Sequence, residues 1–183
     1  SQYHHSSFER YHLQAEITKV CYEIKETILG DPKFNKINFD ELLNPKFLEK
    51  LSSKIGSTKV YASENLYVTS NPETVYLSVV DKDLNAVSFI NSICHGFGSC
   101  ITSNNTGILF QNRGVNFRLE KNHPNAIEGG KRPLHTIIPG LITNNQNETT
   151  LCYGVMGGQY QPIGQSHILQ NIFDYNLRIQ ESL

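Results

Sequence analysis

The apolar residues of this chain change their period at residue 74, and that change constrains the fold more than any other feature. Before it, they recur at three- and four-residue steps, as on one face of a helix: Leu13, Ile17, Cys21, Ile24 and Ile28. After it, short apolar runs alternate with turn clusters, which favours antiparallel strands. Helices, then strands, then a final helix predict an α+β fold in which helices cover a sheet.

Residues that begin and end helices bound these elements. Gly30-Asp31-Pro32 ends the first helix, and Asn44 followed by Pro45 begins a second that stops before Gly56. Residues 57–73 are polar without a period, so they predict an exposed loop of the kind that is cut. The strands are expected at Thr74–Val80, Ala86–Ile93, Gly107–Gln111, Ile137–Thr143 and Leu151–Met156, with a turn at Asp81–Asn85. The last helix carries its apolar stripe on Ile168, Leu169, Ile172, Phe173 and Leu177 and is expected to reach the end of the sequence.

Thr74 stands where the polar loop meets the first strand. A threonine in this place suits a self-cleaving hydrolase, because cutting the bond before it leaves a free α-amine beside its hydroxyl. That pair can perform nucleophilic catalysis by itself. The alternative is a β-branched residue that merely starts a strand, and this short segment alone does not separate the two.

Composition excludes several classes of function. A net charge of −1 with scattered basic residues predicts no binding to nucleic acid, and no apolar run is long enough for a membrane segment. The four cysteines form no C-x-x-C pair and have no histidine at zinc spacing, so we expect a reduced protein without metal or cofactor. No signal peptide is visible. The sequence does not begin with methionine, since its only methionine is Met156, and it stops inside the expected last helix. We therefore expect polypeptide beyond both ends.

Gly157-Gly158 lies between a predicted strand and the last helix. Paired glycines there allow the backbone to approach a ligand closely, and N–H groups near a helix N-terminus suit a developing negative charge. The alternative is a tight strand-to-helix turn that needs positive φ angles.

Two further polar groups are candidates for substrate binding. Arg113 and Asn116 follow the expected strand Gly107–Gln111, where an arginine can bind a carboxylate with two donors or remain a solvated loop residue. His135 and Thr136 lead into the next strand, where the histidine either orients a substrate or forms an ordinary hydrogen bond at a strand edge.

Taken in order, these pieces resemble the gamma-glutamyltransferase family of N-terminal-nucleophile hydrolases. The matching blocks are Thr74–Asp83 with Asn85–Ser88, Gly96–Ser99, Gly107–Asn112, Asn125–Glu128 with Gly130–Leu134, and Gly157-Gly158. Upstream, Tyr11–Glu16 and Gly30-Asp31-Pro32 resemble the region before the family's cleavage point. The resemblance covers nearly the whole chain, although family members are several times longer.

The resemblance implies part of an αββα sandwich and self-cleavage between Glu73 and Thr74. Residues 1–73 would be the C-terminal part of a large subunit, residues 74–183 the N-terminal part of a small one, and the two would pair. Thr74 would accept the γ-glutamyl group of glutathione or a related amide, and water, an amino acid or a peptide would remove it. The α-amine of Thr74 would be the general base, Ser92 would orient the hydroxyl, and the N–H groups of Gly157 and Gly158 would stabilise the oxyanion.

The chain departs from the family's pattern at five expected substrate contacts. Cys94 stands where members place an asparagine for the substrate amino group, and Arg113 and Asn116 replace a glutamine and an aspartate. His135 and Thr136 replace paired serines that hold the substrate carboxylate. These changes resemble the divergent, acylase-like branch, so two alternatives remain open. One is an acylase for dicarboxylic, glutaryl-type amides with Arg113 on the distal carboxylate, and the other is a truncated, non-catalytic homologue.

Overall fold

The computed structural model describes residues 3–62 and 72–183, and the chain divides into two compact units. The first comprises Ser1–Tyr67 and Asn116–Leu134, and the second comprises Val68–Val115 and His135–Leu183. Residues 116–134 therefore group with the N-terminal helices although strands precede them in sequence. The predicted division into 1–73 and 74–183 refers to cleavage of the peptide bond before Thr74 and stays a prediction. Residues 63–71 of the predicted loop lie outside the described residues.

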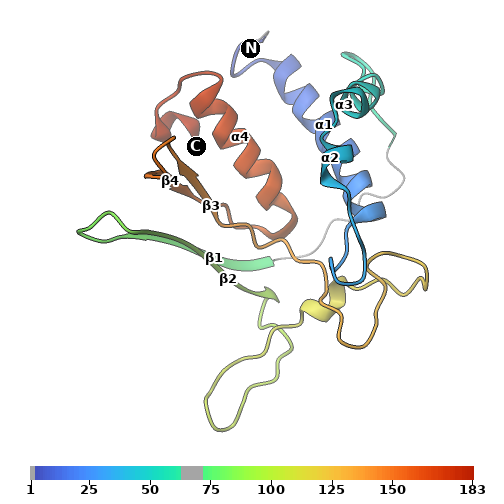
Figure 1. The fold of residues 1–183 in the computed structure, drawn as a ribbon, viewed down its shortest axis with the longest axis vertical. Coiled ribbons are helices and arrows are strands. Elements are labelled where there is room, and N and C mark those ends of the chain that lie inside the picture. The colour runs from blue at the N-terminus through green and yellow to red at the C-terminus, as the bar shows by residue number, and fades with distance from the viewer. Residues whose placement is uncertain (1–2, 63–71) are drawn as a thin grey trace. The chain divides into compact units, whose positions relative to one another are not determined.

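Three helices form the first unit: α1 (Phe8–Ile28), α2 (Phe39–Leu42) and α3 (Pro45–Ser52) (Figure 1). The predicted start at Asn44 is confirmed, because its side chain accepts a hydrogen bond from the Lys46 N–H and Pro45 occupies the first turn. The helix was expected to continue to Gly56, but α3 ends at Ser52.

Segment 116–134 is attached to α1 by polar contacts. Arg118 Nη2 lies 2.5 Å from Glu26 Oε2, and His123 Nε2 lies 2.6 Å from the Glu26 carbonyl oxygen. Gly30 follows the end of α1, and a Cβ there would collide with the Pro124 carbonyl. A glycine is therefore needed at this position for the close approach of two backbones, rather than for a left-handed helix end.

The second unit contains two antiparallel hairpins: β1 (Pro72–Val80) pairs with β2 (Ala86–His95), and β3 (Gly140–Thr143) pairs with β4 (Thr149–Tyr153). The predicted turn after β1 is confirmed. Asp81 Oδ1 accepts hydrogen bonds from the N–H groups of Asp83 and Asn85 at 2.9 and 2.8 Å, and Leu84 adopts a positive φ of 62°.

The strand expected at Gly107–Gln111 does not form. Only Leu109 forms a ladder-type bridge, with Thr102, and Phe110 bonds back to Ile101 and Ser99 within the same irregular loop. The strand expected from Ile137 begins only at Gly140. Pro139 has no N–H to donate, and the backbone groups of Ile138 are bonded to side chains of the last helix.

Helix α4 (Gln161–Phe173) follows Gly157 and a short 3₁₀ turn, η2 (Gly158–Tyr160). It buries polar residues: Gln161 Oε1 accepts from the Ile138 N–H at 3.3 Å, and the Gln165 amide donates to the Ile138 carbonyl. The helix ends at Phe173, so the expectation that it extends through Leu177 to the end of the sequence is wrong. The last residues form a separate 3₁₀ turn, η3 (Ile179–Ser182).

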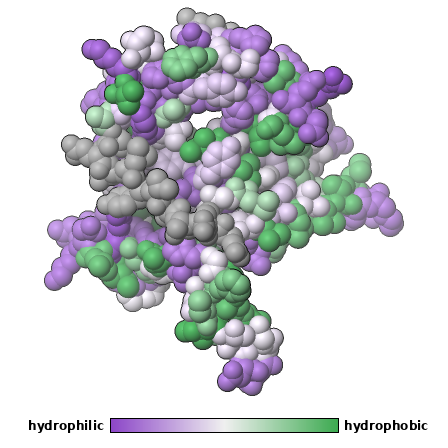
Figure 2. Space-filling view, turned by 180° about the vertical axis from the view of Figure 1, so that it is seen from behind, coloured by the Kyte–Doolittle hydropathy of each residue, from purple (hydrophilic) through white to green (hydrophobic). Residues whose placement is uncertain are grey.

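The mixture of helices and antiparallel strands confirms the predicted α+β class. Within the described residues, every helix is too short or too polar to span a bilayer. One face of the β1–β2 hairpin is apolar and exposed, and Figure 2 shows apolar colour along this arm up to its hydrophilic tip. The exposed apolar residues of this face are Val75, Leu77, Val79, Val87 and Phe89.

Candidate active site

A β-bulge lies at the predicted cleavage point. Glu73 pairs with Cys94 and Thr74 with Ser92, so Ile93 has no partner on β1. A bulge of this kind interrupts the ladder and increases the local twist, and bulges are frequent beside active sites. The bond between Glu73 and Thr74 is thus the one place where the pairing of β1 with β2 is irregular.

The Thr74 hydroxyl faces the hydroxyl of Ser92. Thr74 Oγ1 donates to Ser92 Oγ at 3.4 Å, and the same Ser92 oxygen accepts from the Cys94 N–H at 3.1 Å. The two side chains come from paired positions of neighbouring strands, which explains why they meet. This contact agrees with the orienting role expected of Ser92, although the role itself stays a prediction.

Thr74 and Gly157 line the same hollow, which has a volume of about 690 Å³. The other lining residues are Val75, Asn91, Ser92, Ile93 and Met156. Gly157 and Gly158 both have positive φ angles, 113° and 56°, which only glycine adopts easily. The turn that they form leads into η2 and α4, and β1 contacts η2. The glycine pair therefore lies beside the strand that carries Thr74.

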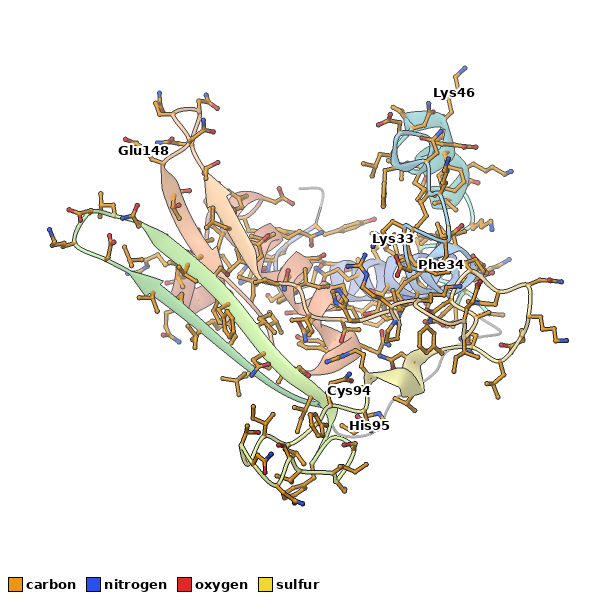
Figure 3. All side chains as sticks on the ribbon, turned by 60° about the horizontal axis from the view of Figure 1, so that its bottom comes forward. Lys33, Phe34, Lys46, Cys94, His95 and Glu148 are labelled. Carbon is orange, nitrogen blue, oxygen red and sulfur yellow. The ribbon has the colours of Figure 1, made fainter. Side chains whose placement is uncertain are left out.

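Cys94 and Arg113 lie beside this pair of hydroxyls. Cys94 is buried and has a φ of 80°, an uncommon conformation for a residue with a side chain (Figure 3 labels it at the end of β2). Arg113 is only 8% exposed, and its Nη2 donates to the Ser92 carbonyl at 3.3 Å. Within residues 3–62 and 74–183, no carboxylate lies within ion-pair distance of Arg113.

Asn116 and His135, two of the remaining predicted contacts, form hydrogen bonds within their own units. Asn116 belongs to the first unit, where its side chain donates to the Leu134 carbonyl at 2.9 Å. His135 is exposed, its Nδ1 accepts from the Ile137 N–H at 3.3 Å, and Thr136 is half-buried. Their proposed roles in substrate binding stay predictions.

Met156 and Asn112 are among the residues of this region that had no predicted role. Met156 lines the hollow, and Asn112 holds the end of β2 by hydrogen bonds to Ile93 and His95. No local pattern identifies either, because both act on residues distant in sequence. Among the described residues, no group of three histidine, cysteine, aspartate or glutamate side chains is arranged to hold a metal ion.

Comparisons with known proteins show which family the chain belongs to. The model of the family described as gamma-glutamyltranspeptidase matches residues 1–183. The glutathione hydrolase-like YwrD proenzyme of Bacillus subtilis is 38% identical over all of this chain and 34% of its own length. The oxamate amidohydrolase proenzyme of Klebsiella pneumoniae is 34% identical over 94% of this chain and 32% of its own length.

Among solved structures, cephalosporin acylase from Bacillus halodurans matches 98% of this chain and 32% of its own length, with 35% identity and a TM-score of 0.83. This match confirms the expected fold class. The chain thus spans about a third of the length of these relatives. Because the family model covers every residue, the chain belongs to the gamma-glutamyltranspeptidase family.

Proposed function

We propose that this chain carries the nucleophile of an N-terminal threonine amidase that transfers or hydrolyses γ-glutamyl groups. The observation that carries the proposal is the meeting of Thr74, Ser92 and Gly157 around one hollow in a member of this family. The lining of this hollow combines a hydroxyl nucleophile, an orienting hydroxyl and a glycine turn whose N–H groups suit an oxyanion.

In the first step, Thr74 Oγ1 attacks the carbonyl carbon of Glu73. The C–N bond between these residues breaks, the Thr74 nitrogen takes the hydroxyl proton, and the Glu73 acyl group becomes an ester on Oγ1. Water then hydrolyses the ester, leaving a Glu73 carboxylate and a free α-amine on Thr74. The bulge interrupts the ladder at this bond, so fewer strand contacts oppose the rearrangement.

In the second reaction, the α-amine of Thr74 takes the hydroxyl proton while Oγ1 attacks the γ-carbonyl of glutathione or a related amide. The N–H groups of Gly157 and Gly158 stabilise the tetrahedral oxyanion. The departing amine receives the proton, and the γ-glutamyl group remains on Oγ1 as an ester. Water, an amino acid or a peptide amine then accepts it.

Mass analysis of the purified chain during incubation tests the proposal. We expect fragments that correspond to residues 1–73 and 74–183, and no such fragments from Thr74→Ala. A folded chain that stays intact, with Thr74→Ala equally stable, would contradict the proposal and favour a non-catalytic homologue. Where a longer gene product is encoded, the same experiment on it tests whether self-cleavage requires segments that this chain lacks.

A second candidate substrate class is favoured by Arg113. Within residues 3–62 and 74–183 its buried guanidinium has no carboxylate partner, and a buried cation is usually paired. Oxamate, which the Klebsiella relative's name specifies, itself carries a carboxylate, and the Bacillus halodurans protein is an acylase. A dicarboxylic acyl group would place its distal carboxylate on Arg113.

Paired chromogenic substrates divide these candidates. We expect turnover of a γ-glutamyl anilide if the first class is correct, and preference for a glutaryl anilide if Arg113 selects dicarboxylic acyl groups. In the second case, Arg113→Met should raise KM for the glutaryl anilide more than for an uncharged butyryl anilide. An equal effect on both substrates would contradict the carboxylate contact.

A further inference from the structure

The bulge at the end of β2 leaves a backbone carbonyl without a partner in the ladder. Ile93 faces no residue of β1, and its carbonyl oxygen accepts a hydrogen bond from the Asn112 N–H at 3.2 Å. Ile93 is half-buried, and a backbone carbonyl that is shielded from water without a partner costs free energy, so this bond stabilises the bulged conformation.

The side chain of Asn112 holds the next turn of the same segment. Its Oδ1 accepts from the His95 N–H at 3.1 Å, and its Nδ2 lies 3.1 Å from His95 Nδ1. Because the backbone N–H can only donate, the amide orientation is fixed with Oδ1 toward it. Nδ2 must then donate to His95 Nδ1, so the ring carries its proton on Nε2.

These three bonds bracket the most strained residue of the site. Cys94, with its φ of 80°, lies between Ile93 and His95, and its N–H donates to Ser92 Oγ. Figure 3 shows Cys94 and His95 together where β2 ends. A left-handed conformation at a residue with a side chain persists only where its surroundings impose it. Asn112 supplies such contacts on both sides of Cys94.

We propose that Asn112 is a positioning residue, a clasp that fixes the end of β2 and thereby holds Ser92 opposite Thr74. Its role in the reaction rests on the proposed function, while its effect on the strand end does not. Without its side chain, the turn at Cys94 relaxes, and the 3.4 Å contact between the two hydroxyls is lost.

Self-cleavage of three variants tests the effect on the reaction. We expect Asn112→Ala to cleave about a hundredfold more slowly than the original chain, because small displacements of reacting groups are costly. Asn112→Asp keeps an acceptor for the His95 N–H and should retain an intermediate rate. Asn105→Ala, which changes an exposed asparagine of the same loop, is the matched control and should cleave normally.

Alkylation of the thiols by iodoacetamide tests the clasp without any catalysis. Cys94 is buried and should react about tenfold faster in Asn112→Ala, because local opening exposes it. Cys152 on β4 is the internal reference, and its rate should not change. If Asn112→Ala does not fold, the protonation of the His95 ring in Asn112→Asp tests the clasp instead. A carboxylate oxygen next to His95 Nδ1 can only accept a hydrogen bond, so Nδ1 must then carry a proton. Nitrogen NMR of that ring should show Nδ1 protonated, and a ring that keeps Nδ1 as a bare acceptor would overturn the clasp.

The outcomes separate the two proposals. If the original chain and Asn112→Ala cleave at the same rate, the clasp is overturned and the proposed function stands. If the original folded chain does not cleave, the proposed function fails. An unchanged Cys94 alkylation rate in Asn112→Ala then overturns the clasp as well. Slow cleavage together with fast alkylation in Asn112→Ala supports both.

Discussion

At the scale of the residue, the site depends on one shared oxygen. Ser92 Oγ accepts from both the Thr74 hydroxyl and the Cys94 N–H. Ser92→Ala removes this acceptor, and we expect self-cleavage to slow about a hundredfold, the lower range for loss of a group that assists proton transfer. Ser92→Thr keeps the hydroxyl and is the control. Intact-mass time courses measure both, and equal rates for Ser92→Ala and the original chain would remove Ser92 from the mechanism.

A second residue-scale prediction concerns the turn between β1 and β2. Leu84 is exposed and has a φ of 62°, which costs a residue with a side chain more than it costs glycine. We expect Leu84→Gly to raise the free energy of unfolding by about 0.5–1 kcal/mol, measured by chemical denaturation. Leu84→Ala keeps the strained φ and should give no gain. A loss of stability in Leu84→Gly would show that the leucine side chain contributes contacts that outweigh the strain.

At the level of the elements, the ring of Tyr76 on β1 packs against Gly154, the residue that follows β4. A Cβ at Gly154 would collide with the ring of Tyr76, whose hydroxyl lies 3.1 Å from Ser88 Oγ. Gly154→Ala should therefore lower the free energy of unfolding by about 1–3 kcal/mol, the usual cost of overpacking. Gly129→Ala has open space around it and should change stability by less than about 0.5 kcal/mol. Equal thermal shifts in the two variants would contradict this packing.

At the scale of the whole molecule, the first unit joins residues from both sides of the predicted cleavage point. Asp31 is buried and accepts from the Arg132 N–H at 2.8 Å and from its guanidinium at 3.3 Å. Glu26 and Arg118 form a second such pair. We therefore expect the two fragments to stay associated after cleavage and to elute together in size-exclusion chromatography.

The folding stability that Asp31 contributes should depend on pH in a defined direction. The hydrogen bonds from the Arg132 N–H, the Lys33 N–H and the Arg132 side chain hold the pKa of Asp31 well below its usual value. A lowered pKa in the folded state stabilises it above the unfolded carboxyl pKa of about 3.9, and the effect is lost as pH falls further. Asp31→Asn should therefore lower the melting temperature at pH 7, and the difference should shrink below about pH 4. A constant difference across this range would contradict the charge as the cause.

Features of this protein that depend on neighbouring residues could be predicted from its sequence. Asn44-Pro45 fixes a helix start, Asp81–Asn85 a turn and Thr74–Val80 a strand, because caps, turns and alternation act over a few positions. The family blocks identified the order of the pieces and the candidate nucleophile. These signals need no knowledge of what packs against them.

The places where distant segments meet could not be predicted from the sequence, because they depend on packing. Residues 107–111 have the composition of a strand, yet their backbone groups bond within their own loop. Segment 116–134 groups with the N-terminal helices through partners about a hundred positions away in sequence, such as Asp31 and Arg132. The bulge at Thr74 and the Asn112 clasp arise in the same way, because hydrogen-bond partners far apart in sequence are chosen by packing and leave no local pattern.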